Sequence, residues 1–321
     1  TAGPTMTLFN HKFSRSLLLG AAAALLAAWG AGGGNDSPTS NPTGRLKLSV
    51  TDAPVDDAQA VWVQFRAVEF KPEGAEPMRQ DLKDANGATA PQRINLLPLQ
   101  DGRAAVLLDG VVLPAGRYEW LRLLVDNEPN VRDSYIEIAG NECELRIPSG
   151  DESGLKLIRG FTLAEQGALA LTVDFDLRKS IHAPLGQQGS GMNCTQAYQM
   201  KPVLRLVQDS QVGGISGTVA NALIADPACA RLVYVFADAA GAAAGSTTPD
   251  DYDGTAPDPV VMAKVDSATG AYRASFLPAG NYTLAFTCSA DKMDANDALV
   301  FSAAKGATVA AGVVTTGVNF Q

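Results

Sequence analysis

Short runs in which apolar and polar residues alternate place the strongest constraint on what this chain can fold into. At positions 46–50, Leu46, Leu48 and Val50 alternate with polar residues. Residues two apart on a strand share one face, so this pattern predicts a strand with one buried face. Similar runs recur to the end of the chain, separated by glycine, proline, aspartate and asparagine, and no segment has a long helical period. The sequence therefore predicts an all-β fold.

The runs form two groups, for which we expect two β-sandwich domains in tandem. The first domain is expected over residues 45–210 and the second over residues 211–321. The expected strands of the first domain lie at 46–50, 61–70, 104–108, 118–125, 134–138, 143–147, 155–158, 168–175 and 202–207. Those of the second domain lie at 232–237, 259–265, 271–276, 282–287, 299–302 and 313–320.

One short motif occurs once in each group. Residues 113–118 read LPAGRY, and residues 277–282 read LPAGNY. The proline presets a turn, the glycine permits its exit, and the tyrosine begins the next strand at the edge of the sandwich. We interpret the repeat as a structural device and assign no function to it.

Residues 1–30 have the layout of a bacterial secretory signal. Basic residues up to Arg15 precede an apolar run at 17–28, which is shorter than the roughly 20 residues of a membrane-spanning helix. Residues 31–44 are rich in glycine, serine, proline, threonine and asparagine and are expected to form a flexible spacer. The folded part is therefore expected outside the cytoplasm, either in the cell envelope or secreted.

The end of this leader, LAAWG at 26–30, is similar to a lipoprotein lipobox, in which cysteine would stand in place of Trp29. Lipidation needs a thiol, and an indole cannot replace it. Two interpretations stay open: this sequence has lost its lipid anchor, or a general signal peptidase cleaves nearby, after Gly30. Contact with a membrane is expected only through such an anchor, as in an outer-membrane lipoprotein.

The composition excludes several functional classes. The chain has 25 basic and 34 acidic residues, a net charge of −9, whereas nucleic-acid binding needs basic patches. Of the two histidines only His182 lies outside the leader, so a histidine-rich metal site or a serine–histidine–aspartate triad is not expected. The sequence has no GxSxG nucleophile motif, and no pair of carboxylates stands out as that of a glycosidase.

An even number of cysteines outside the cytoplasm indicates disulfides. The four are Cys143, Cys194, Cys229 and Cys288, and no two have the CxxC spacing of a zinc or redox motif. Three pairings are possible. We prefer Cys143–Cys194 and Cys229–Cys288, because each bridge then lies within one expected domain.

Several segments of the first group resemble a bacterial envelope lipoprotein family catalogued as domain of unknown function 4382. Residues 48–55 (LSVTDAPV) and the run at 61–70 resemble the opening of that family. Residues 113–123 resemble its central segment, and residues 154–157 and 171–181 resemble its end. The resemblance implies an envelope location and no particular activity. The second group resembles carboxypeptidase regulatory-like, transthyretin-type sandwiches, which implies a stalk or binding module.

Aspartates near the strand ends of the first group are candidate calcium ligands. Asp174 and Asp176 lie two apart on an expected strand, so they share a face, and Asp52 follows another strand. Calcium prefers six to eight oxygen ligands. The alternative is structural: a capped turn at Asp52 and a strand end that pairs with Arg178 and its neighbour.

A second candidate calcium loop begins at residue 250. Asp251 and Asp253 stand in the sequence DDYDG, within a stretch rich in alanine, glycine, serine, threonine and proline. This loop lacks the ligand spacing and the terminal glutamate of an EF-hand, so a solvated polar loop is the alternative. No other cofactor is expected.

Two tryptophans are candidates for a ligand platform. Trp62 and Trp120 can stack on sugars if they are exposed, and packing within the sandwich is the alternative.

We therefore expect a non-enzymatic envelope or surface protein that acts by binding or scaffolding, with an unknown surface protein or glycan as its partner. One alternative is an adhesin module that binds carbohydrate or protein. The other is a hydrolase that uses acidic residues, which a cleft with two facing carboxylates would favour.

Overall fold

Strands dominate the secondary structure of this chain. The computed structural model describes residues 42–52, 58–126, 131–148, 154–184, 194, 196–252, 255–291 and 298–321. Within these ranges the regular structure consists of strands, one α-helix of four residues and two short 3-10 helices. The predicted all-β fold is confirmed. The leader with Trp29, most of the expected spacer and Asp253 lie outside the described residues.

The first group of strands forms two sheets that face each other. The smaller has the order β14-β11-β1-β5, in which β1 is parallel to β11 and antiparallel to β5. Its strands are β1 (Thr43–Asp52), β5 (Ala105–Pro114), β11 (Ala168–Phe175) and β14 (Leu204–Gln208). Strand β1 begins within the expected spacer, because Thr43 and Gly44 pair with β5 through their backbones.

The larger sheet has ten strands, with the path β10-β6-β2-β7-β8-β13-β12. Strands β3 and β4 pair with β2, and β9 pairs with β6. The strands are β2 (Ala60–Pro72), β3 (Met78–Asp81), β4 (Gln92–Asn95), β6 (Gly116–Val125), β7 (Tyr135–Ile138), β8 (Asn141–Arg146), β9 (Leu155–Leu157), β10 (Phe161–Leu163), β12 (Ile181–His182) and β13 (Tyr198–Met200).

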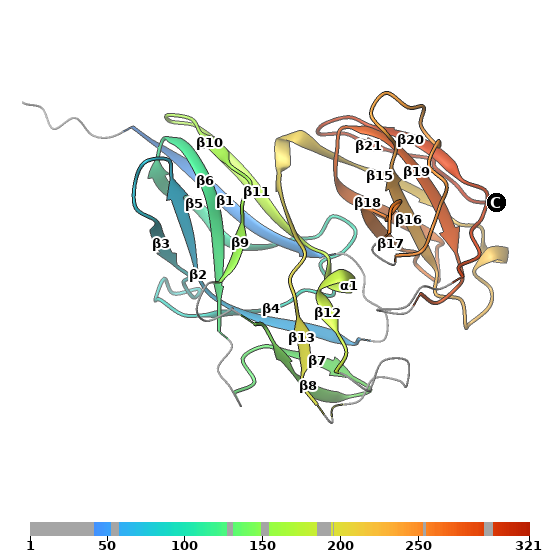
Figure 1. Ribbon diagram of the computed structural model, residues 1–321, viewed down its shortest axis with the longest axis horizontal. Helices are drawn as coiled ribbons and strands as arrows, with labels where there is room; N and C mark the ends of the chain where they lie inside the picture. The colour runs from blue at the N-terminus through green and yellow to red at the C-terminus, as the bar shows by residue number, and fades with distance from the viewer. Residues whose placement is uncertain are drawn as a thin grey trace, which may run out of the picture. The chain divides into compact units, whose positions relative to one another are not determined.

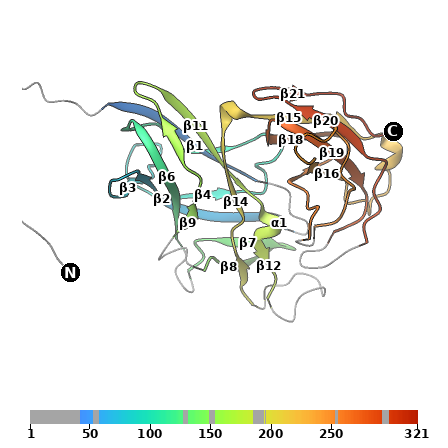
Figure 2. The same cartoon turned by 45° about the horizontal axis from the view of Figure 1, so that its top comes forward.

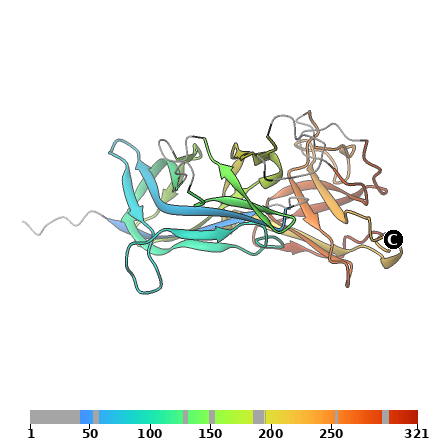
Figure 3. The same cartoon turned by 90° about the horizontal axis from the view of Figure 1, so that it is seen from below.

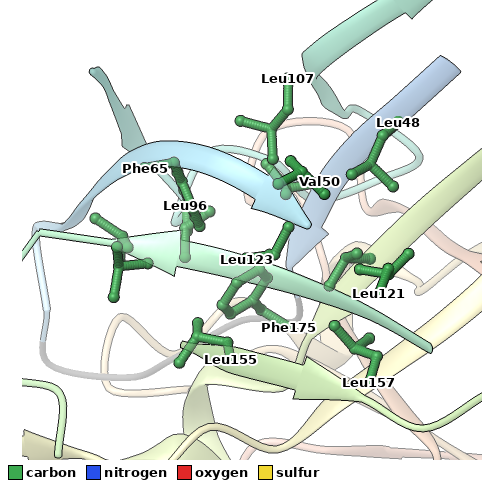
Figure 4. Close-up of a cluster of buried hydrophobic side chains, with 14 of the residues drawn as sticks. Leu48, Val50, Phe65, Leu96, Leu107, Leu121, Leu123, Leu155, Leu157 and Phe175 are labelled. Atoms are coloured by element: carbon green, nitrogen blue, oxygen red, sulfur yellow. The ribbon is translucent and has the colours of Figure 1, made fainter. Parts of the chain in front are cut away.

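The first hydrophobic core lies between these two sheets. Leu48 and Val50 of β1 and Phe175 of β11 point toward Phe65 of β2 and Leu123 of β6, and all five are buried (Figure 4). Phe65 and Phe175 meet edge to face, with ring centroids 6.1 Å apart. The alternation seen in the sequence therefore supplies the inward side chains of both sheets.

The second group of strands forms a three-stranded sheet, β18-β15-β21, and a four-stranded sheet, β17-β16-β19-β20. The strands are β15 (Val212–Thr218), β16 (Leu232–Ala237), β17 (Val261–Lys264), β18 (Ala271–Pro278), β19 (Gly280–Thr287), β20 (Lys305–Val309) and β21 (Val314–Thr315). Ile215, Val233, Val235 and Leu284 belong to a second buried core between them. In Figure 3 these orange and red strands group apart from the blue and green strands of the first group.

Some expected strands of the second group differ from the structure. Residues 299–302 contribute only an isolated bridge between Phe301 and Thr287, and β20 takes the place beside β19. The sequence of β20, KGATV, has only two inward apolar residues, Ala307 and Val309, so its pattern is weak. The expected strand at 313–320 is reduced to β21 and a bridge at residue 320.

Both expected disulfide pairings are confirmed. Cys143 of β8 is bonded to Cys194, and Cys229 is bonded to Cys288 just after β19. Each bridge lies within one group of strands. Disulfides persist in oxidising compartments, so this protein belongs outside the cytoplasm. No helix in the described ranges is long and apolar enough to cross a membrane.

The short helix α1 (Leu177–Ser180) lies where the two groups of strands meet (Figures 1 and 2). Asp176 caps its start by accepting a hydrogen bond from the Lys179 backbone nitrogen at 3.2 Å. The Lys179 ammonium donates to the carbonyl of Pro259 at 3.1 Å, in the other group. Residues Asn41–Gln321 form one compact unit, and independent folding of residues 211–321 stays a prediction.

Candidate binding surfaces

Trp62 lies on the solvent-facing side of the ten-stranded sheet. Its neighbours on β2, Val61 and Val63, are fully buried, whereas Trp62 is half-buried. Its ring stacks on that of Tyr135 from β7, with centroids 6.1 Å apart and planes inclined by 25°. The Arg93 guanidinium lies 5.9 Å from the centre of the Tyr135 ring. We call Trp62, Arg93 and Tyr135 the Trp62 platform.

Trp120 forms a second platform on the same sheet. Trp120 is half-buried beside the buried Leu121 of β6. The Lys156 ammonium lies 4.5 Å and the Arg122 guanidinium 5.0 Å from the ring, distances typical of cation–π contacts. Arg122 is also ion-paired with Glu69 at 2.6 Å. We call Trp120, Arg122 and Lys156 the Trp120 platform.

The two platforms stand near opposite ends of β2. Trp62 is near the start of this strand, and Trp120 is paired with Lys71 near its end. Nine residues of extended chain span about 30 Å, so the platforms are separate surfaces. Each ring is partly exposed, which stacking on a ligand requires. Each ring also contacts side chains of its own sheet.

The calcium candidates Asp174 and Asp176 both have basic partners. Asp174 accepts a hydrogen bond from Arg205 Nε at 3.2 Å, and Asp176 is ion-paired with Lys179 at 3.3 Å. Burial raises the pKa of both carboxyls above the usual value, and the basic partners oppose this shift. The contact of Asp176 with Lys179 is the kind of pairing that the sequence offered as the alternative, whereas the partner of Asp174 is Arg205, which that alternative did not name.

Asp52 and Asp251 are buried. Asp52 accepts a hydrogen bond from the Leu177 backbone nitrogen at 3.3 Å, and it lies one residue beyond Thr51, which pairs with Asp174. Among the described residues no three aspartate, glutamate, histidine or cysteine side chains are grouped as metal ligands. The structure thus brings Asp52 and Asp174 onto neighbouring strands, and calcium binding stays a prediction.

The sequence pattern did not reveal a cleft of about 700 Å³ between the two groups of strands. This volume is within the range of small-molecule sites. Its lining comes from the connection between β4 and β5, the segment before β16, the turn between β17 and β18, and β18 itself. The charged residues among these are Asp101, Arg103, Arg231, Lys264, Asp266 and Arg273.

The two carboxylates of the cleft are in different surroundings. Asp101 is 3.6 Å from Arg103, and burial raises its pKa. Asp266 accepts hydrogen bonds from the hydroxyl and backbone nitrogen of Thr269 and from the backbone of Ala268, which lower its pKa. The only signals in the sequence are the turn-forming residues around these aspartates. Arg103 and Ala230, the nearest lining residues of the two sides, are 127 positions apart, so local sequence patterns do not reveal the cleft.

Comparison with known proteins gives one family match. Residues 43–202 match the model of a family described as domain of unknown function (DUF4382). This range agrees with the resemblance stated for the first group of strands and names no activity. The chain has no significant match among curated proteins.

Solved structures give only weak similarities. The Bacillus anthracis TIE protein is 12% identical at a TM-score of 0.19, and the match covers 86% of this chain and 33% of that protein. GBS52, the minor pilin of Streptococcus agalactiae, is 11% identical at a TM-score of 0.19, and the match covers 85% of this chain and 94% of that protein. BcpA, the major pilin subunit of Bacillus cereus, is 13% identical at a TM-score of 0.18, and the match covers 86% of this chain and 99% of that protein. This chain spans a third of the TIE protein, and we base no functional argument on these similarities.

Proposed function

We propose that this chain is a non-enzymatic envelope or secreted protein that binds a glycan through its tryptophan platforms. The observation that carries the proposal is the position of Trp62 and Trp120. Both tryptophans of the described residues lie on the solvent side of one sheet, although that sheet buries leucine, valine and phenylalanine on its other side. Tryptophan is costly to leave in water and is enriched where proteins bind ligands and partners.

The chemistry around the rings suits a carbohydrate. An indole face packs against the C–H groups of a pyranose ring, and nearby polar side chains can bond its hydroxyls. Gln64, between the rings on β2, accepts hydrogen bonds from Arg93 and donates one to Asp126 at 3.0 Å. A protein partner is the alternative occupant, as in an adhesin.

Intrinsic fluorescence tests this proposal directly. We would titrate the full chain, carrying Trp29→Phe, with a panel of soluble neutral polysaccharides. Binding should change the emission, and Trp62→Ala or Trp120→Ala should weaken it by about fivefold or more. Val300→Ala is the matched control, because Val300 is an exposed apolar residue of the second group. Absence of binding across the panel would refute the glycan ligand, and unchanged affinity in both tryptophan variants would refute the platforms.

The anchoring of the protein needs a separate measurement. We propose that the residue at position 29 decides between membrane attachment and release. The intact mass of the mature protein from envelope and medium fractions distinguishes the two. A lipid-free mass in the medium or periplasm supports release, and a lipid-modified mass contradicts it.

A hydrolase is a second candidate because of the carboxylates in the cleft. Asp101 has a raised pKa and Asp266 a lowered pKa, and opposed shifts within one site are typical of acid–base pairs. Release of reducing sugars from the same polysaccharide panel tests this alternative. Our proposal expects none. Release that Asp101→Asn abolishes would establish the hydrolase instead.

A further inference from the structure

We propose that the cleft between the two groups of strands binds a segment of an acidic polysaccharide. Four cations line it, Arg103, Arg231, Lys264 and Arg273, against the carboxylates of Asp101 and Asp266. The whole chain has a net charge of −9, so this local excess of positive charge runs against its composition. The proposal does not depend on the tryptophan platforms, whose residues are not in the lining.

Three of the four cations form no ion pair with a carboxylate of the described residues. Arg103 lies 3.6 Å from Asp101. Among the described residues, no carboxylate lies within ion-pair distance of Arg231, Lys264 or Arg273. Their charges are therefore available to a ligand, and a negative group in a concave site gains more from them than one on open surface.

Two of the cations are held in place by neutral groups. Arg231 donates from Nη2 to the carbonyl of Asp226 at 3.2 Å and from Nε to that of Ile224 at 3.4 Å. Arg273 donates from Nε to the Ser275 hydroxyl at 3.1 Å. These hydrogen bonds orient the guanidinium groups, and because the acceptors are neutral they do not cancel the positive charge. A cation that is already oriented loses less entropy when a ligand binds.

The backbone at Arg231 supports the same interpretation. Arg231 has a φ of 57°, in the left-handed region that is unfavourable for a residue with a side chain. The preceding Ala230 donates from its nitrogen to the carbonyl of Cys288 at 3.0 Å, and Cys288 is bonded to Cys229. The disulfide and this hydrogen bond fix the backbone next to Arg231, which lines the cleft.

The carboxylates of the cleft are engaged with their own surroundings. Asp266 accepts from the backbone and hydroxyl of its own turn, and Asp101 faces Arg103. Neither is ion-paired with Arg231, Lys264 or Arg273, and Arg273 attracts the Asp101 carboxylate without pairing with it. An anionic ligand meets an excess of positive charge and not a neutralised pair.

The size and remaining lining of the cleft define the kind of anion. A volume of about 700 Å³ exceeds what one inorganic ion fills. Gln100, Ser267 and Thr269 add an amide and two hydroxyls, which match the hydroxyls of sugar rings. The charged groups match a carboxylate or sulfate on the same rings. An acidic sugar chain matches both the uncharged polar groups and the cations of the lining.

Binding of defined polymers tests the proposal. We would measure calorimetric titration of the full chain at low salt with polygalacturonate and with dextran sulfate, which separate carboxylate from sulfate recognition. Neutral dextran is the uncharged control, and polyglutamate represents an acidic peptide. We expect binding to at least one acidic polysaccharide, none to dextran, and an affinity that falls as salt is added.

A pair of charge-matched variants separates the cleft from the overall charge. Lys264→Glu with Arg273→Glu should lower the affinity by about a hundredfold, since each lost charged contact is worth about tenfold or more. Lys47→Glu with Lys305→Glu changes the net charge equally at exposed sites outside the lining. This control should lower affinity by less than about threefold. All four native side chains are exposed, so the fold should tolerate these four substitutions, and thermal melting of both double variants checks this.

Three results would overturn the proposal. They are no binding to either acidic polysaccharide, an equal loss in both double variants, and tighter binding of polyglutamate than of either polysaccharide. The last would assign the cleft to an acidic peptide. Unchanged binding in Trp62→Ala and Trp120→Ala is expected, because the two proposals concern different residues.

Discussion

The guanidinium of Arg178 and the carboxylate of Asp291 form an ion pair, with Nη2 3.0 Å from Oδ1 and both side chains almost fully buried. The same guanidinium also donates to the backbone carbonyl of Asp291, and the Tyr234 hydroxyl donates to its Oδ2. The pair joins α1 to the segment after β19, across 113 residues of sequence. It is therefore a polar lock between the two groups of strands.

Breaking this lock from one side should destabilise the protein strongly. Arg178→Ala leaves the buried Asp291 carboxylate without its cation, which typically costs about 3–5 kcal/mol. Urea denaturation of the full chain gives the free energy of unfolding. Arg178→Met with Asp291→Asn removes both charges and should recover much of the loss. If Arg178→Ala lowers the free energy of unfolding by less than about 1 kcal/mol, the ion pair does not hold the two groups of strands together.

The two disulfides should contribute similarly to stability. They link residues 51 and 59 apart, and closing loops of this length is worth about 4 kcal/mol in the chain-entropy model. Cys143→Ser with Cys194→Ser, and the corresponding change of Cys229 and Cys288, should each lower the unfolding free energy by about that amount. Intact mass with and without reductant confirms that the natural chain carries both bridges. An unchanged denaturation midpoint in either variant would argue against its role.

The repeated LPAG motif makes the same hydrogen bond in both groups of strands. The hydroxyl of Tyr118 donates to the carbonyl of Pro114, and that of Tyr282 to Pro278, both at 2.7 Å. Both rings are buried. Tyr118→Phe and Tyr282→Phe should each cost about 1 kcal/mol, because each leaves a proline carbonyl without this donor. Thermal melting of both variants checks whether the losses are equal, as the shared geometry predicts.

Asp238 should make part of the stability depend on pH. Burial acts to raise the pKa of this carboxyl, but hydrogen bonds from Thr283, Thr247 and Gly245 outweigh it and lower the pKa below 3.8. A lowered folded pKa stabilises the protein above the unfolded value, and this contribution is lost as pH falls through the folded pKa. Asp238→Asn should therefore cost up to about 1 kcal/mol at pH 7, because solvent screens a carboxylate this exposed.

The pH dependence supplies the check on this carboxyl. Denaturation of the natural chain and of Asp238→Asn should be compared at a series of pH values. The difference between their unfolding free energies should shrink as pH falls from about 3.8, the ordinary value, through the lower pKa of the folded protein, where the native carboxylate becomes protonated. A difference that stays constant over that range would show that ionisation of Asp238 does not stabilise the fold.

Strands with clear alternation were predictable from the sequence, and weak or very short strands were not. The run at 61–70 became β2 and that at 232–237 became β16, because each offers several large apolar residues to a core. Strands β12 and β21 have two residues each and are defined by backbone pairing. No side-chain pattern marks such strands, so local sequence does not predict them.

The candidate sites divide in the same way. The position of Trp62 opposite the apolar residues of its strand follows from the period of two, and the structure places it on the solvent side. The partners of Asp174 and the four cations of the cleft come from segments far apart in the chain. Sequence spacing carries no information about such neighbours.

The sequence by itself determined the all-β class, the inward faces of the longer strands and, with an oxidising compartment, the presence of two disulfides, whereas the structure decided how the four cysteines pair. The properties determined by the sequence follow from local periodicity and from counting. Only the tertiary structure decided that Arg178 meets Asp291 and that Arg103 lines one cleft with Arg231. The physical reason is that these contacts depend on how whole sheets pack, and sheet packing is set by the sum of many buried side chains and not by any one segment.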